Sequence, residues 1–153
     1  MVIQNALFKG RKRLSGLTIP RATYTSPEIA QVGLTEAGAA SAGIRVRVWR
    51  KDWAEVDRAR AEGNPAGFVK ILTAASSDRI VGATICGPHA GDLISEISVA
   101  MAGKIGLGQL ASVIHPYPTR AEAIRQLGDS YNRTRLTPWV AAGFRKWLAW
   151  QRR

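Results

Sequence analysis

Two apolar segments joined by a short polar turn constrain the fold more than any other feature of the chain. The stretch GFVKILTAASSDRIVGATICG, residues 67–87, contains two runs of mostly apolar residues separated by Ser-Ser-Asp. Runs of this length around a polar turn are typical of two antiparallel strands. The sequence therefore predicts a β-hairpin in the middle of the chain.

The residues before this hairpin predict two more strands and a short helix. Residues 21–35 alternate around Ser-Pro, which indicates one extended strand with a kink. A short helix should follow, with Thr35 as its N-cap and Gly43 just after its end. Residues 44–53 alternate almost strictly and predict a half-buried strand. Its basic outer face would carry three side chains, Arg45, Arg47 and Trp49.

Two helices are expected after the hairpin. Apolar residues recur at helical spacing from Ala90 to Lys104, and a second helix should run from about Arg120 to Tyr131. Thr119 and Glu122 form a capping-box pattern at the start of the second helix. The order of elements predicts an α+β fold, an antiparallel sheet with helices packed on one face. We expect the apolar faces of both helices to form a dimer interface.

The excess positive charge lies at the two ends of the chain. Residues 1–60 carry eleven Lys and Arg against five Asp and Glu, and residues 123–153 carry seven against one. Such ends could bind nucleic acid or an anionic membrane surface, but no nucleic-acid motif accompanies them. A solvated basic surface, or one that faces an acidic neighbouring domain, is the favoured interpretation. The order of the N-terminal residues is wrong for a secretory signal, so a cytoplasmic protein is expected.

The segment 137–153 predicts a basic amphipathic helix rich in tryptophan. At about 100° per residue, its large apolar side chains fall on one half of the helix and its Arg and Lys residues on the other. One interpretation is an anchor at a membrane interface, which would make the protein membrane-peripheral. The favoured interpretation is a helix that docks on the parent domain or on another subunit.

Few residues could carry chemistry. The candidates are His115, Tyr117, Glu122, Cys86 and His89. Tyr117 is boxed by two prolines, and its hydroxyl could donate a hydrogen bond or a proton at a neighbouring site. Cys86 follows a hydrophobic strand and is expected to be a buried, inert thiol, and His89 to shape a helix start. No second ligand has metal-site spacing, so no metal site is expected.

Four ordered blocks resemble a known family. They are YTSPEIAQVGLTE (24–36), DRARAEGNPAGFVKI (57–71), DRIVGATICGPHAGDLISEI (78–97) and IHPYPTRAEAIR (114–125). Together they resemble the C-terminal dimerisation domain of the pyridine nucleotide-disulfide oxidoreductases, flavoenzymes that include dihydrolipoamide dehydrogenase and mercuric reductase. The resemblance divides the chain into 1–19 as a remnant of a preceding domain, 20–132 as the interface domain and 133–153 as a tail.

The resemblance implies roles for three residues. In such enzymes a turn of this domain enters the partner's active site, where a histidine before Pro-Thr acts as acid and base for a dithiol, supported by a glutamate. Tyr117 stands in the place of that histidine, Glu122 matches the glutamate, and His115 falls on a non-catalytic histidine of the pattern. A tyrosine there resembles the mercuric-reductase-like branch, but the paired C-terminal cysteines of that branch are missing.

The chain lacks the family's cofactor-binding parts. It has no glycine-rich dinucleotide fingerprint after a strand and only one cysteine, so no redox pair. FAD and NAD(P) are implied for the full-length enzyme, and neither is expected to bind this chain alone. We expect a truncated or split oxidoreductase that forms a homodimer and does not turn over alone. If it is split, a FAD/NAD-binding chain would complete it in trans. The alternative is a stand-alone dimeric module that binds an anionic membrane surface or nucleic acid through its basic ends.

Overall fold

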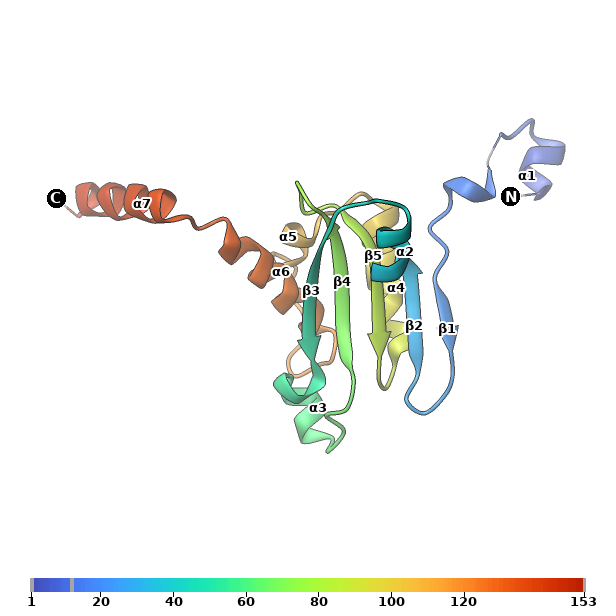
Figure 1. The fold of residues 1–153 in the computed structure, drawn as a ribbon, viewed down its shortest axis with the longest axis horizontal. Coiled ribbons are helices and arrows are strands. Elements are labelled where there is room, and N and C mark those ends of the chain that lie inside the picture. The colour runs from blue at the N-terminus through green and yellow to red at the C-terminus, as the bar shows by residue number, and fades with distance from the viewer. Residues whose placement is uncertain (1, 12, 153) are drawn as a thin grey trace.

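Five antiparallel strands form one sheet in the computed structural model, which describes residues 2–11 and 13–152. Across the sheet the strands lie in the order β1-β2-β5-β4-β3, and every neighbouring pair is antiparallel (Figure 1). Their bounds are β1 Arg21–Thr23, β2 Ile29–Gly33, β3 Val46–Asp52, β4 Phe68–Ala74 and β5 Ile80–Cys86. The predicted hairpin is the β4–β5 pair, with Ile71 opposite Ala83.

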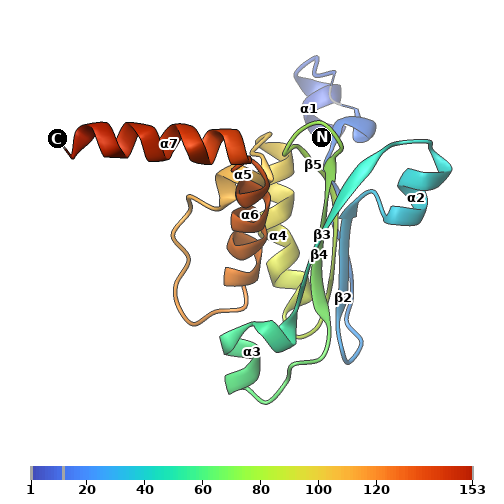
Figure 2. The same cartoon turned by 60° about the vertical axis from the view of Figure 1, so that its left-hand side comes forward.

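The two long helices of the body cover one face of the sheet, and a short helix lies on the other. The α-helices are α1 Val2–Leu7, α2 Glu36–Ser41, α3 Asp57–Ala61, α4 Ala90–Ala102, α5 Leu107–Leu110, α6 Glu122–Thr134 and α7 Pro138–Gln151, and the 3-10 helices are η1 Leu14–Gly16 and η2 Trp53–Glu55. Helices α4 and α6 lie on the same face, α4 against β1, β2 and β5 and α6 against β3 and β4, and α2 lies on the other face (Figure 2). The predicted α+β fold with helices packed on one face is confirmed.

The core lies between the sheet and helices α4 and α6. The side chains at alternate positions of β2, β4 and β5 point to this face, and they meet the apolar stripes of the two helices. Among the largest are Val32, Ile71, Ile85, Ile97 and Ile124, all almost completely buried. The helix at 36–41 is also confirmed, since the Thr35 side chain accepts a hydrogen bond from the Gly38 amide at 3.0 Å.

The prediction for the faces of β3 is wrong. Trp49 packs edge-on against Tyr131 of α6, with ring centroids 5.4 Å apart, and the Arg47 guanidinium lies 4.6 Å over the Trp49 ring. Val48, expected inside, is 45% exposed. Both faces of this strand carry apolar side chains, so alternation alone does not say which one a helix will cover. The covering helix α6 lies over the Arg47 and Trp49 face.

Two local predictions are also corrected. Residues 21–35 do not form a single kinked strand, because the chain reverses near Pro27 and gives the hairpin β1–β2. The capping box before α6 does not form either. Thr119 Oγ1 donates to the Pro116 carbonyl at 2.8 Å, and α6 begins only at Glu122, which pairs with Arg125. The hydroxyl of Thr119 closes the turn instead of capping the helix.

The expected dimer interface on the apolar faces of α4 and α6 is wrong as well. Ile94 and Ile97 of α4 and Leu127 of α6 are buried in the chain's own core. These faces are therefore already covered before any partner binds, and a partner must meet other surfaces.

The two ends of the chain project in opposite directions from this body (Figure 1). The amphipathic helix predicted over 137–153 is present as α7, but it does not dock on its own domain, and Trp139 is 88% exposed. Docking on the parent domain is therefore wrong, and docking on another subunit stays a prediction. None of the helices described combines the length and the apolar character that crossing a bilayer requires. The division at residues 19 and 133 also stays a prediction.

Candidate functional site

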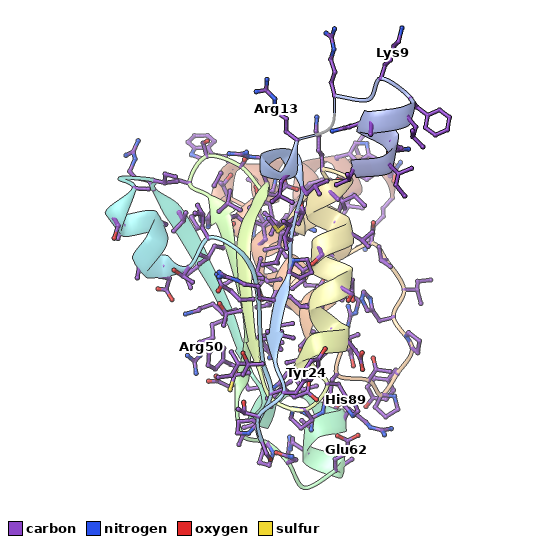
Figure 3. All side chains as sticks on the ribbon, turned by 90° about the vertical axis from the view of Figure 1, so that its right-hand side faces the viewer. Lys9, Arg13, Tyr24, Arg50, Glu62 and His89 are labelled. Atoms are coloured by element: carbon purple, nitrogen blue, oxygen red, sulfur yellow. The ribbon has the colours of Figure 1, made fainter. Side chains whose placement is uncertain are left out.

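The residues that could carry chemistry gather around one turn. We call residues 113–121 the Pro-Tyr-Pro turn; it links α5 to α6 and lies beside α3 and the first part of α4. A groove of about 340 Å³ runs between these three segments, lined by Glu62, His89 and Thr119 among others. Figure 3 shows Glu62 and His89 at this end of the molecule. The turn is therefore placed by two helices that are remote from it in sequence.

His115 anchors the turn to α4. Its side chain is 6% exposed, and its Nε2 lies 2.9 Å from Glu96 Oε1. Its Nδ1 lies 3.0 Å from the Val113 carbonyl oxygen. Both ring nitrogens are thus engaged within the chain. The arrangement suits a residue that holds the turn more than one that exchanges protons with a substrate.

Arg120 anchors the other end of the turn to α3. It is 5% exposed; its Nε donates to Glu62 Oε2 at 3.0 Å and its Nη2 to the Asn64 carbonyl at 3.1 Å. The guanidinium also lies 5.1 Å from the centroid of the Trp53 ring. Hydrogen bonds from Arg58 first, and from Arg120 second, lower the pKa of Glu62 below its ordinary value. Glu62 therefore stays ionised and keeps the turn linked to α3.

Trp53 forms the floor under Arg120. It is fully buried, and its Nε1 donates to the Cys86 carbonyl at 2.7 Å. A Cβ at position 87 would lie 2.2 Å from Trp53 Nε1, so only glycine fits at Gly87. This contact ties η2, and through it α3, to the end of β5.

Tyr117 is the exposed member of the turn. It is 69% exposed, and its hydroxyl donates to Asp57 Oδ2 at 2.9 Å. That hydrogen bond, with a smaller contribution from the charge of Glu122, raises the pKa of the phenol above its ordinary value. The neutral phenol is the form these carboxylates favour, and its single hydrogen is donated to Asp57. Beside it, Ile114 is 94% exposed.

Glu122 lies at the start of α6, where its carboxylate binds Arg125 at 2.9 Å, and Arg125 in turn binds Asp129 at 2.8 Å. The charge of Glu122 makes the smallest contribution to the raised pKa of Tyr117. His115 instead turns toward α4 and Glu96. Tyr117 is thus bound to Asp57 and Glu122 to Arg125, and His115 supports the turn from behind.

The remaining candidates lie at the edge of this site. Cys86 is half-buried at the end of β5. His89 occupies the N-cap position of α4 with a positive φ of 60°, and its exposed side chain lies 3.7 Å from Asp92. In the described part of the chain, no three His, Cys, Asp or Glu side chains are grouped as a metal ion would need.

Five supporting residues were missed by the sequence reasoning. They are Trp53, Asp57, Glu62, Glu96 and Arg120. Asp57 and Tyr117 are 60 residues apart, and Glu62 and Arg120 are 58 apart. No local spacing marks contacts over such separations. The block 57–71 was recognised, but nothing in it indicated that α3 meets the turn.

The described residues do not fit a dinucleotide cofactor such as FAD or NAD(P). Phosphates bind at helix N-termini through free backbone amides. At the start of α4 the Gly91 amide donates to Glu28 Oε2 at 3.1 Å, so a carboxylate of the chain already occupies this position. The antiparallel sheet also lacks the βαβ unit on which the fingerprint turn is built.

Comparison with known proteins identifies the fold. A family described as "Pyridine nucleotide-disulphide oxidoreductase, dimerisation domain" matches residues 19–127. A dihydrolipoyl dehydrogenase of Thermus scotoductus is 33% identical over 124 residues, which cover 81% of this chain and 27% of the relative. Dihydrolipoyl dehydrogenase 3 of Pseudomonas aeruginosa is 40% identical over 108 residues, 71% of this chain and 23% of the relative. The chain thus spans about a quarter of the length of these relatives.

Solved structures of related enzymes contain the same fold. The crystal structure of LpdA from Mycobacterium tuberculosis matches with a TM-score of 0.78 and 26% identity, over 85% of this chain and 28% of that one. The HOCl-induced flavoprotein disulfide reductase RclA from Escherichia coli matches with a TM-score of 0.76 and 22% identity, over 84% of this chain and 30% of that one. At this identity the match shows a shared fold. These matches give no support to the alternative of a stand-alone membrane- or nucleic-acid-binding module.

Proposed function

Because the chain belongs to the dimerisation-domain family of the pyridine nucleotide-disulphide oxidoreductases, we propose that its Pro-Tyr-Pro turn completes the redox site of a partner subunit in a homodimer. One observation carries this proposal. The buried side of the turn is held by His115 and Arg120, while Tyr117 and Ile114 point outward. A rigid turn with exposed residues loses little freedom when it enters a preformed site.

The three site residues take different roles in this proposal. Tyr117 reaches the reacting groups and donates a hydrogen bond or a proton there when its hydroxyl turns away from Asp57, whose carboxylate keeps the free phenol protonated. Glu122 acts through its charge on Tyr117, and Arg125 keeps it in place. His115 is a positioning residue, since both of its nitrogens bind within the chain.

The complete enzyme uses FAD and NAD(P), held by domains other than this one, in the same polypeptide or in a chain that acts in trans. It works in the cytoplasm, and its substrate is a disulfide or another oxidant. Tyr117 stands where a dithiol-specific relative is expected to have its basic histidine, so the substrate of this enzyme differs from dihydrolipoamide.

A domain exchange tests the proposal. Residues 20–132 would replace the corresponding domain of the Thermus scotoductus dihydrolipoyl dehydrogenase, to which the chain is 33% identical. We expect a dimeric, flavin-containing chimaera that still reduces a dye with NADH. Its oxidation of dihydrolipoamide should be about 100-fold slower or more, because the general base is missing.

The Tyr117→His variant of the chimaera should recover at least about tenfold of the lost dihydrolipoamide activity. Tyr24→His is the matched control, because Tyr24 is 80% exposed and lies outside the turn. A monomeric chimaera would contradict the homodimer. Equal activity of Tyr117→His and Tyr24→His would contradict the role of the turn.

A further inference from the structure

Helix α7 is a surface that the proposed redox role does not use. It lies beyond residues 19–127, the part of the chain that matches the family. Both ribbon views show it projecting away from the sheet and the helices packed on it (Figures 1 and 2). It is 14 residues long, or about 21 Å at 1.5 Å per residue.

The apolar side of α7 is exposed and aromatic. Three of the chain's five tryptophans lie in this helix. Trp139 and Trp150 are largely exposed, and Phe144, Trp147 and Leu148 are about half exposed. At about 100° per residue these side chains fall within one half of the helix circumference. An apolar face that is this exposed in the free chain indicates a site where another layer binds and covers it.

The charges of α7 and of the residues just before it indicate what that layer is. The chain has no acidic residue after Asp129, but it has six Arg and Lys residues. Arg145 and Arg152 lie on the half of α7 opposite the tryptophans, and Arg133 and Arg135 lie just before it. A partner must therefore offer an apolar layer and, next to it, negative charge.

A second copy of the chain does not fit this requirement. Two α7 helices that paired through their tryptophans would turn Arg145 and Arg152 outward, and neither helix has a carboxylate that could neutralise them. The surface of an anionic bilayer fits, because its phosphates lie level with the cations while the acyl chains receive the apolar half. Tryptophan also prefers this interfacial depth. The length of α7 is below that of a bilayer span, so the helix would lie in the plane of the interface.

We propose that α7 is an interfacial anchor that attaches this oxidoreductase subunit to an anionic phospholipid bilayer, with Trp139, Trp147 and Trp150 in the membrane and Arg145 and Arg152 against the headgroup phosphates. The anchor is independent of the redox role, and neither depends on the success of the other.

Vesicle binding by the full chain tests this. The probes are vesicles of phosphatidylcholine alone and of phosphatidylcholine mixed with phosphatidylglycerol, followed by co-sedimentation and tryptophan emission. We expect binding to the mixed vesicles with a blue shift of the emission, weakened by added salt. Binding to phosphatidylcholine alone should be at least about tenfold weaker, because each cation near an anionic surface contributes about 1 kcal/mol.

Two pairs of substitutions separate the two sides of α7. Arg145→Gln with Arg152→Gln should weaken binding to the mixed vesicles about 30-fold, from two lost charges. Trp147→Gln with Leu148→Gln should reduce the blue shift and weaken binding more than about tenfold. Arg50→Gln is the matched control: it removes an exposed cation from the sheet and should leave binding unchanged.

Three results would overturn the anchor. The first is equal binding to both kinds of vesicle. The second is unchanged binding by both α7 variants, which would assign the interaction to the exposed apolar residues near the N-terminus, such as Phe8. The third is no vesicle binding together with an oligomer that the Trp147→Gln, Leu148→Gln variant dissociates, which would assign α7 to a protein interface.

Discussion

The Pro-Tyr-Pro turn and helix α7 both expose aromatic side chains, and they are supported in opposite ways. Tyr117 is 69% exposed, but the side chains of His115 and Arg120 in the same turn are buried and bound to α4 and α3. Trp139 of α7 is 88% exposed and belongs to a helix that projects from the body. Exposure is similar in the two regions, and the support beneath is not.

This difference indicates what each region can recognise. A surface with fixed side chains loses little conformational entropy on binding, so it suits a partner whose shape is also fixed, such as a redox site. A projecting amphipathic helix has no such framework. It suits a partner that adapts to it, and a lipid interface is fluid enough to do so.

The largest effect is expected from removing one tryptophan under the turn and one in α7. Trp53→Ala should lower the free energy of unfolding by about 3–5 kcal/mol, because it empties a fully buried site under Arg120. Trp150→Ala in α7 should change it by less than about 0.5 kcal/mol. Urea unfolding followed by circular dichroism measures both. Similar losses in the two variants would show that α7 is packed against the body in solution.

A smaller effect is expected from a matched pair of arginines. Arg120→Met should cost about 2 kcal/mol, since it leaves the Asn64 carbonyl without this donor and removes the stack on Trp53. Arg145→Met, in α7, should stay within about 0.5 kcal/mol of the wild type. Amide exchange in residues 113–121 should rise in the first variant only. Unchanged exchange there would mean that Arg120 does not hold the turn.

The titration of Tyr117 tests the hydrogen bond between the turn and Asp57, and no large change in stability is expected. Its pKa lies above the ordinary value of 10.0, chiefly through the hydrogen bond to Asp57. The contact therefore stabilises the fold below about pH 10 and is lost as the pH rises through the raised pKa of the folded state. Phenolate absorbance, assigned by difference from Tyr117→Phe, should show ionisation at lower pH in Asp57→Asn.

Asp78→Asn is the control for that titration, because Asp78 lies in the β4–β5 turn, at the other end of the hairpin from Cys86. It should leave the phenolate curve of Tyr117 where it is. A curve that moves equally in both variants would mean that general charge, and not the bond to Asp57, raises the pKa.

Much of the fold follows from local sequence. The β4–β5 hairpin, α2 with its Thr35 cap, and α4 were all predicted, because each depends on periodicity or on capping within a few residues. Part of the candidate site was also predicted: the motif indicated Tyr117 and Glu122. The roles assigned to them remain predictions.

The supporting half of the site could not be found in this way. Asp57 and Glu62 meet the turn across about sixty residues, and only the packing of α3 under the turn brings them there. His115 was considered for catalysis because it is a histidine beside a proline. Its burial against Glu96 depends on where α4 passes, which the motif does not specify.

By itself, the sequence determined the β4–β5 hairpin and the helices α2, α4 and α6, the apolar stripes of α4 and α6, and a tail that is basic and rich in tryptophan. These properties arise from neighbours in the chain. Only the tertiary structure decided that Trp49 and not Val48 faces α6 on β3, that Thr119 closes a turn, and that α7 stands apart from the core. Each of these outcomes depends on which element covers which face, and the free energy of that choice comes from burial between residues far apart in the chain.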